Sequence, residues 1–277
     1  MCRLYAHWDL LWTLVSRELA VKYQGAVLGN LWSLLHQLSQ LLIFTYVFSV
    51  VLQVKLNLPT LPENQFTFSL WLFAGLVPWT AFTTGIVQAA SAVINQPNLV
   101  KKVVFPLMLL PLVPVSAAFL ESLLGLAILW VATILSSQVV HGVLLLLPLL
   151  WLTQLALTIG IAYVVAGLTV FLRDIPQTVA VLVNLWFYLT PIVYPIAKVP
   201  KEFQHWILWL NPVATIVEVY RDIMLVGKIQ HGGEWLVASL LSGAVLYGGA
   251  RLYRRLRPAF ADVLEARCKI WIGIILT

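Results

Sequence analysis

Residues 106–136 read PLMLLPLVPVSAAFLESLLGLAILWVATILS, a long apolar stretch that holds a single charged side chain, Glu121. About 20 such residues suffice to cross the hydrocarbon core of a bilayer as an α-helix. Within lipid, only a helix or a closed barrel satisfies the backbone hydrogen-bonding groups, and this stretch lacks the alternation of a barrel strand. It therefore predicts a transmembrane helix.

The rest of the chain has the same character. Of its 277 residues, 61% are hydrophobic and only 10% are charged, and the mean hydropathy is +0.93. A soluble domain would carry about a quarter charged residues. We expect one all-α transmembrane domain over 1–277 with six transmembrane helices. The predicted spans are 29–54, 67–92, 106–136, 142–172, 176–195 and 234–253.

The N-terminal segment 3–24 is amphipathic and predicts a helix that lies in the membrane interface. Its apolar residues recur at spacings of three and four, and its polar residues fall largely on the other side. The apolar set is Leu4, Trp8, Leu11, Trp12, Val15, Leu19 and Tyr23. A soluble surface helix is the alternative, which the two tryptophans and the adjoining membrane segment disfavour.

A second apolar stretch, 203–226, is broken by Asn211-Pro212 and contains Glu218, Arg221 and Asp222. It is too polar and too interrupted for an ordinary span. A re-entrant or interfacial helical hairpin on the outer side fits better, because such a segment must be buried in protein or line a cavity.

The orientation follows from the distribution of Lys and Arg. With the N-terminus inside, twelve of the 17 basic residues fall on that side and five on the other, which predicts that both termini and the tail 254–277 are cytoplasmic. The net charge of +6 is no argument for nucleic acid, because these charges cluster beside membrane segments. We expect membrane lipids, and no nucleic acid, as partners.

Motifs for catalysis are missing from the sequence. It has no Walker A loop and no His-Glu-x-x-His, and its five histidines are scattered. We therefore expect no catalytic residue, no metal site and no bound cofactor in this chain.

Glu121 is the exception in the apolar interior. An ionisable group at that depth usually faces a cavity or a partner. It either touches the substrate or a gate, or it holds helices together through hydrogen bonds.

Glu218 and Arg221 are three residues apart and can pair on one helical face. The pair is either a surface ion pair, which contributes little, or a latch at the outer mouth.

Aromatic residues, Trp79, Phe82 and Tyr194 among them, are dense near the segment ends. An interfacial aromatic belt is the favoured interpretation, and a path on which sugars stack is the alternative.

The loop 95–106, NQPNLVKKVVFP, is partly apolar and bounded by prolines. A plain connector would be short and polar. This one predicts a short cytoplasmic helix that docks onto another protein, with Asn98, Lys101, Lys102 and Phe105 as candidate contacts.

Six short motifs in a fixed order carry a resemblance over about residues 10–225. They are Arg17-Glu18 with Lys22-Tyr23 and 28–32 (LGNLW), 75–79 (GLVPW), 98–106 (NLVKKVVFP), Arg173-Asp174-Ile175, 191–195 (PIVYP) and Leu210-Asn211-Pro212. In these the chain resembles the permease subunit of type 2 ABC exporters of lipid-linked polysaccharide, the O-antigen and teichoic-acid export permeases.

The resemblance implies a homodimer paired with two copies of a separate ATP-binding cassette subunit in the bacterial inner membrane. That subunit would bind ATP and Mg and hydrolyse the ATP, and a polyprenyl-diphosphate-linked glycan would be exported. The residues expected to couple to it are Arg17, Glu18, Asn98, Lys101, Lys102, Phe105, Arg173 and Asp174. Those expected along the substrate path or at its gate are Trp79, Phe82, Glu121, Tyr194, Asn211, Glu218 and Arg221.

Three other functions compete with this one. A permease of the same fold that exports a drug or a small lipid ranks second. A membrane-embedded enzyme acting on lipid-linked sugar would need catalytic carboxylates or histidines, and a stand-alone carrier would more often show internal repeats.

Overall fold

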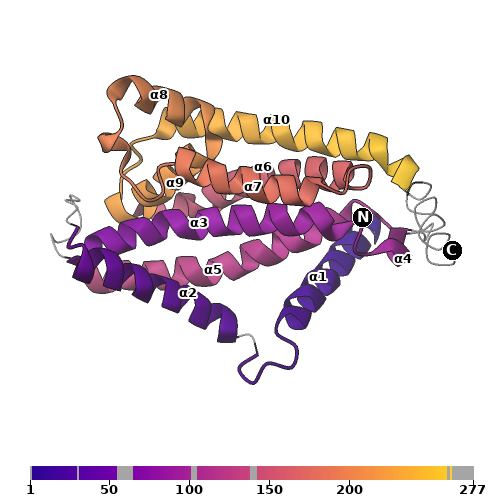
Figure 1. The fold of residues 1–277 in the computed structure, drawn as a ribbon, viewed down its shortest axis with the longest axis horizontal. Helices are drawn as coiled ribbons and strands as arrows, with labels where there is room; N and C mark the ends of the chain where they lie inside the picture. Colours follow the sequence, from indigo (N-terminus) through magenta and orange to yellow (C-terminus); the bar gives the residue numbers. More distant parts are fainter. Residues whose placement is uncertain are drawn as a thin grey trace, which may run out of the picture.

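The protein is helical throughout its ordered elements in the computed structural model, which describes residues 2–29, 31–54, 65–100, 105–137, 142–260 and 263. No strand occurs in these ranges, and the helices pack side by side into an elongated bundle (Figure 1). The predicted all-α class is confirmed.

The α-helices and the shorter helical turns follow one another in this order. They are α1 (Cys2–Lys22), α2 (Leu31–Phe44), η1 (Thr45–Val51), α3 (Gln65–Ala92), α4 (Pro97–Val100), α5 (Leu109–Ser137), η2 (Gly142–Leu146), α6 (Leu147–Thr169), α7 (Ile175–Leu189), η3 (Ile196–Lys198), α8 (Lys201–Leu210), α9 (Pro212–Arg221), η4 (Asp222–Val226), α10 (Gly232–Leu256) and η5 (Arg257–Ala259).

Five helical segments of the described chain are long and apolar enough to cross a membrane. They are Leu31–Val51, Phe66–Ala92, Leu109–Ser136, Gly142–Thr169 and Gly232–Ala259. They correspond to five of the six predicted spans.

The other predicted span, 176–195, is represented by α7, which has 15 residues. At 1.5 Å per residue α7 is about 22 Å long, shorter than the roughly 30 Å of hydrocarbon. Thr190 adopts an extended conformation (φ −99°, ψ 132°), as the residue before a proline prefers, and Pro191 follows. The helix therefore ends earlier than the apolar run, and six spans remain a prediction.

The central helix is α3, which packs against α2, α5, α6, α7 and α9. Its buried aromatic and aliphatic side chains form most of the main core. On the other side of the bundle α10 runs along α6 (Figure 1), and the two backbones meet where Gly249 lies against the carbonyl of Gly160. A side chain at Gly249 would collide with that carbonyl.

The segment 203–226 is a pair of helices, α8 and α9, broken at Asn211-Pro212 as predicted. The Asn211 carboxamide oxygen accepts from the backbone N–H groups of Val213 and Ala214 and so caps α9. All ten residues of α9 are buried, whereas no residue of α8 is. Whether this hairpin re-enters the membrane stays a prediction.

The predicted N-terminal helix is present as α1, but only some of its apolar residues are packed against the bundle. Leu11, Val15 and Leu19 pack against α5, while Trp8 and Trp12 are exposed. Figure 1 shows α1 and α2 meeting at a corner partway along the bundle, so that the two helices together cover one face of α3 and α5. The location of α1 in a membrane interface stays a prediction.

Segments that lie far apart in the sequence meet at one end of the bundle. A single buried cluster joins Val93 after α3, Val100 in α4, Val170 after α6, Tyr253 near the end of α10 and Phe260 after η5. The Tyr253 hydroxyl donates to the Leu107 carbonyl at 3.0 Å and fixes this arrangement. The predicted tail beyond Phe260 falls, except for Val263, outside the described residues.

Candidate functional site

An ion pair ties the end of α1 to the middle of α5. The Lys22 ammonium donates to both carboxylate oxygens of Glu121, at 2.8 Å to Oε1 and 2.6 Å to Oε2. The Tyr23 hydroxyl donates to Oε1 at 3.2 Å. The side chain of Lys22 is 42% exposed and that of Glu121 is 16% exposed. Glu121 thus has the cationic partner that an ionisable group inside a bundle requires.

The pair forms because the apolar side of α1 packs on α5. Val15 is buried against Val113 and Ala117, which fixes the register of the two helices. Lys22 is the last residue of α1, where a cation also interacts favourably with the helix dipole. Packing of the C-terminal half of α1 on α5 therefore brings the Lys22 ammonium to Glu121.

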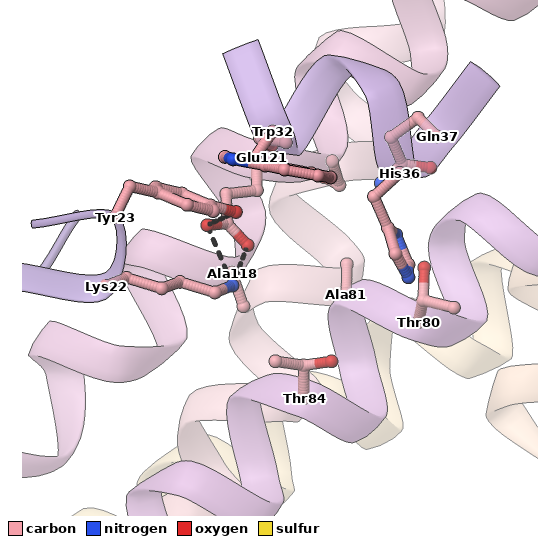
Figure 2. Close-up of a pocket in the computed structure, with 12 residues that line it drawn as sticks. Lys22, Tyr23, Trp32, His36, Gln37, Thr80, Ala81, Thr84, Ala118 and Glu121 are labelled. Carbon is pink, nitrogen blue, oxygen red and sulfur yellow. Dashed lines mark hydrogen bonds and ion pairs between the residues drawn. The ribbon is translucent and has the colours of Figure 1, made fainter. Parts of the chain in front are cut away.

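A recess of about 380 Å³ opens beside this pair, between the α1–α2 corner, α3 and α5. Figure 2 shows its lining, with the ring of Trp32 beside the Glu121 carboxylate and the imidazole of His36 directed toward Thr80 on α3. The lining residues are Lys22, Tyr23, Trp32, Ser33, His36, Gln37, Thr80, Ala81, Thr84, Ala118, Glu121 and Ser122. Hydroxyl, amide and imidazole groups are present among these residues, but the larger part of the lining surface is apolar.

Two smaller hollows continue the recess along α1. One of about 180 Å³ shares Lys22, Ala118 and Glu121 with it. The next, of about 270 Å³, is lined by Arg17 and Glu18. The hollows thus run from the α1–α2 corner toward the end of the bundle that carries α4.

The residues expected to couple to an ATPase lie toward that end, as far as the structure describes them. Arg17 and Glu18 line the same hollow as Asn95 and Gln96, which begin the predicted docking loop. Within the loop, Pro97–Val100 forms the short helix α4, as predicted, and Asn98 on it is exposed.

Further along the loop, the Phe105 side chain packs against the buried cluster at this end. Lys101 and Lys102 lie outside the described residues. Arg173 and Asp174 are exposed in the turn between α6 and α7. A coupling role for any of these residues stays a prediction.

A second ion pair lies in α9, and it is buried. Arg221 Nη1 donates to Glu218 Oε1 at 2.7 Å, and the two side chains are 2% and 8% exposed. The interpretation of this pair as a surface ion pair is therefore wrong. The spacing of the two residues predicted that they pair. The pair is buried because α9 is enclosed by α3, α6 and α10, which the spacing does not show.

Arg221 also holds three backbone carbonyls. Its Nη1 donates to Pro191 at 2.7 Å, its Nη2 to Ile192 at 2.8 Å, and its Nε to Trp71 at 3.3 Å. The guanidinium carbon lies 3.5 Å from the centroid of the Trp71 ring, a cation–π contact. The guanidinium thus joins α3, α9 and the loop after α7.

Asn211, at the other end of α9, links that helix to α7. Besides capping α9, its carboxamide oxygen accepts from Trp186 Nε1 at 3.1 Å, and its Nδ2 donates to Thr190 at 3.0 Å. Asn211 and Tyr194 also line an open aromatic hollow of about 530 Å³ with Trp206 of α8. Both residues therefore lie at one mouth of the bundle.

The predicted path residues Trp79 and Phe82 lie in the packed interior. Their ring centroids are 5.8 Å apart, and they contact Phe187 at 5.6 Å and Trp186 at 5.5 Å on α7. Their contacts join α3 to α7, and a role along a substrate path stays a prediction.

Sequence reasoning missed three features of this chain. It gave Glu121 no named partner, although Lys22 ends a helix that was predicted. It overlooked the polar side chains Ser33, His36 and Gln37, whose helical spacing within an apolar run was a usable signal. It also missed the contact of buried Asp222 with His231, whose Nδ1 lies 2.9 Å from Asp222 Oδ2.

Within the described ranges, no group of three or more His, Cys, Asp or Glu side chains is arranged to hold a metal ion. Among the described residues, the charged side chains in close contact are Lys22 with Glu121, Arg221 with Glu218, and Asp222 with His231.

Comparison with known proteins agrees with this architecture. The sequence profile of the ABC-2 type transporter family matches residues 9–225. The chain is 30% identical over 260 residues to the O-antigen export system permease protein RfbA of Myxococcus xanthus, covering 94% of this chain and 96% of that protein. It is 28% identical over 262 residues to the protein of the same name from Klebsiella pneumoniae, covering 92% and 95%. It is 25% identical over 249 residues to the polysialic acid transport protein KpsM of Escherichia coli, covering 87% and 91%. The chain belongs to the ABC-2 type transporter family.

Proposed function

We propose that this ABC-2 family member is the transmembrane subunit of an ATP-driven exporter of polysaccharide linked to a polyprenyl diphosphate. One observation carries the proposal: similarity to permeases named for O-antigen export extends over more than nine tenths of this chain. The location is the bacterial inner membrane.

The motor belongs to a separate subunit. The sequence holds no Walker A loop, so ATP and Mg bind to a partner ATP-binding cassette protein. We expect two copies of that partner on a homodimer of this chain. The docking face lies at the end of the bundle that carries α4, Arg173 and Asp174, because exposed polar groups from distant segments gather there.

The topology that fits this function has six spans, with α7 as the short one. Both termini and α4 are then cytoplasmic, and the α8–α9 hairpin re-enters from the outer side. The buried Glu218–Arg221 pair holds this hairpin on the bundle, as a latch at the outer mouth would. On this topology Tyr194 and Asn211, which line the hollow beside α8, lie at the outer end of the substrate route, and Glu121 lies nearer its inner end. Trp79 and Phe82 border the route from inside the bundle by holding α3 against α7.

Co-purification tests the need for a motor. The tagged chain is extracted from its native membrane in mild detergent, and we expect a stoichiometric protein with a Walker A motif to accompany it. The double variant Arg173→Ala, Asp174→Ala should lower the recovery of that protein, whereas Gln177→Ala, an exposed polar residue on the next turn, should not. Recovery of the chain alone in several detergents would contradict the proposal.

A transport assay tests the substrate. Inverted membrane vesicles that contain the complex are given ATP and a lipid-linked glycan, and the glycan should become protected from added glycosidase. Movement of a small drug or a simple phospholipid without movement of the glycan would favour the second function, export of a drug or small lipid.

A further inference from the structure

Helix α1 is held to the bundle along one narrow seam. It packs on α5 and makes only slight contact with the other elements of the described chain. Among its side chains from residue 7 onward, Val15 alone is buried, and Leu11, Leu14 and Leu19 pack beside it against α5. Such a seam fixes which face of α1 meets α5, but few buried contacts oppose a tilt of the helix along it.

The corner after α1 does not fix the helix either. Residues 23–29 form two successive turns, in which Gly25 and Gly29 adopt φ values of +82° and +49°. No atom beyond the neighbouring residues lies within 4 Å of the position that a Cβ would occupy at either glycine. Glycine reaches positive φ without steric cost, and the open space beside it lets its dihedrals change. The corner therefore leaves the position of α1 to contacts outside it.

The Lys22–Glu121 pair supplies such a contact. Lys22 is the last residue of α1, and its two hydrogen bonds to Glu121 join the end of the helix to the middle of α5. Both side chains are partly exposed, so the pair contributes little to the stability of the fold. Its main effect is on position, because it determines where the end of α1 meets α5.

From Glu121 the contacts continue into the centre of the bundle. One turn further along α5, Gly125 lies so close to α3 that a Cβ there would stand 3.0 Å from a methyl group of Val77. The next residue of α3 is Pro78, which has no N–H to donate and so interrupts the hydrogen bonds of that helix. A shift of α5 at Glu121 therefore reaches α3 at the point where α3 bends most easily.

Open space on the other side of α1 gives the helix room to move. The two hollows of about 180 and 270 Å³ lie between α1, α3 and α5. Glu18 of α1 and Gln88 of α3 line both hollows, and both residues are exposed. Movement of α1 toward α3 would close the hollows and carry Lys22 with it, and Glu121 would follow through the ion pair.

We propose that Lys22 and Glu121 are positioning residues, through which α1 passes the motion of the ATP-binding subunit to α5 and α3. The inference rests on the proposed function, which places α1 on the side of that subunit. In this role neither residue touches nucleotide or glycan. The requirement is that opposite charges meet between the two helices, so either helix can carry the cation.

Exchange of the two charges in the complete complex tests the proposal. Vesicles that contain this chain and its ATP-binding subunit are assayed for ATP hydrolysis and for glycan export, and the ratio of export to hydrolysis is compared. Lys22→Glu and Glu121→Lys should each lower that ratio by about fivefold or more, the lower range of coupling between two sites. The double variant should restore most of it. Lys198→Glu, a charge reversal at an exposed site of η3, should leave the ratio unchanged.

Two results of this assay would overturn the proposal. One is an unchanged ratio in the single variants. The other is a loss that the double variant does not restore, because each side chain then acts on its own, as Glu121 would if it touched the substrate. If the double variant does not assemble, Lys22→Arg and Lys22→Met decide. Arginine can pair with Glu121 and should keep the ratio, methionine should lower it, and equal ratios would overturn the proposal.

A distance measurement separates this inference from the proposed function. Spin labels are placed at Ser16 on α1 and Leu135 on α5, both exposed, after the two native cysteines are replaced by serine. In the assembled complex without ATP, the distance distribution should be narrow for Lys22→Arg and broad for Lys22→Met. Equal widths in a complex that exports glycan would contradict this inference alone. Different widths in a complex that exports no glycan with ATP would contradict the proposed function alone.

Discussion

Two ion pairs of the described chain, Glu218–Arg221 within α9 and Lys22–Glu121 between α1 and α5, differ in burial and in the groups around them. Glu218 and Arg221 are buried, and Arg221 also donates to three backbone carbonyls. Lys22 and Glu121 are partly exposed, and Tyr23 is the third member of that cluster. A buried, fully paired charge fixes its surroundings, because breaking it leaves an uncompensated charge, whereas an exposed pair holds its helices weakly.

The surroundings of the two pairs differ in the same direction. All ten residues of α9 are buried among α3, α6 and α10, whereas α2 lies largely exposed at the edge of the bundle. Regions with few buried contacts open at lower free energy than packed ones. From this difference we expect α9 to be held more firmly in the bundle than the α1–α2 corner.

The largest expected effect is at Arg221. Arg221→Met would leave Glu218 buried without its partner and three carbonyls unsatisfied, so the free energy of unfolding should fall by about 3–5 kcal/mol. Thermal unfolding in detergent, followed by circular dichroism, measures it. Arg251→Met, which removes an exposed arginine bonded to the Tyr247 hydroxyl, should change stability by less than about 0.5 kcal/mol. An equal loss of stability in Arg221→Met and Arg251→Met would contradict the view that the Arg221 contacts hold α9 firmly.

Asn211→Ala should have the next largest effect. It removes the cap of α9 and leaves Trp186 Nε1 without its acceptor, a loss of about 1–3 kcal/mol. Asn184→Ala, at an exposed position of α7, serves as the matched control. Hydrogen exchange should show faster opening of α9 in Asn211→Ala and no change in Asn184→Ala. Unchanged hydrogen exchange of α9 in Asn211→Ala would show that Asn211 does not stabilise this helix.

A smaller effect is expected at the α1–α2 corner. Lys22→Met and Glu121→Gln should each lower stability by about 0–1 kcal/mol, because the pair is partly exposed and screened. A double-mutant cycle measures the coupling between the two side chains, and Lys198→Met at an exposed position is the control. Coupling as strong as that between Arg221 and Glu218 would contradict a movable corner.

The smallest effect concerns pH. The hydrogen bond to the Asp222 carboxylate raises the pKa of His231, in the loop before α10, above its usual value. A raised pKa in the folded state stabilises the fold fully below the unfolded pKa of about 6.5. This stabilisation is lost as the pH rises through the higher folded pKa. The unfolding temperature should therefore decline across that window, and His231→Gln should flatten the decline. A profile unchanged by His231→Gln would exclude the contact as its source.

Elements whose pattern is local were predictable. The spacing of Leu11, Val15 and Leu19 gave α1, and Asn211-Pro212 gave the break between α8 and α9, because helix periodicity and proline chemistry act within a few residues. Five spans followed from length and apolarity. The end of α7 did not, since an apolar run continues past Pro191 without a helix.

Contacts across the fold were not predictable in this way. Glu121 and Lys22 are 99 residues apart, and nothing local pairs them. The burial of Trp79 and Phe82 against α7 likewise depends on which helix packs beside α3. Aromatic residues near the ends of apolar segments fit a membrane belt, a sugar path or a core equally well by sequence.

The sequence by itself determined that this chain is helical and membrane-spanning, where its hairpin breaks, and which family it resembles. These follow from composition and short-range order, because a bilayer accepts few backbone structures. The tertiary structure alone decided that Glu218 and Arg221 are buried, that Lys22 compensates Glu121, and that the shielded carboxamide oxygen of Gln37 accepts no hydrogen bond from the described residues. Burial and pairing depend on contacts between residues from distant parts of the chain. Local sequence patterns do not reveal which of these residues come together.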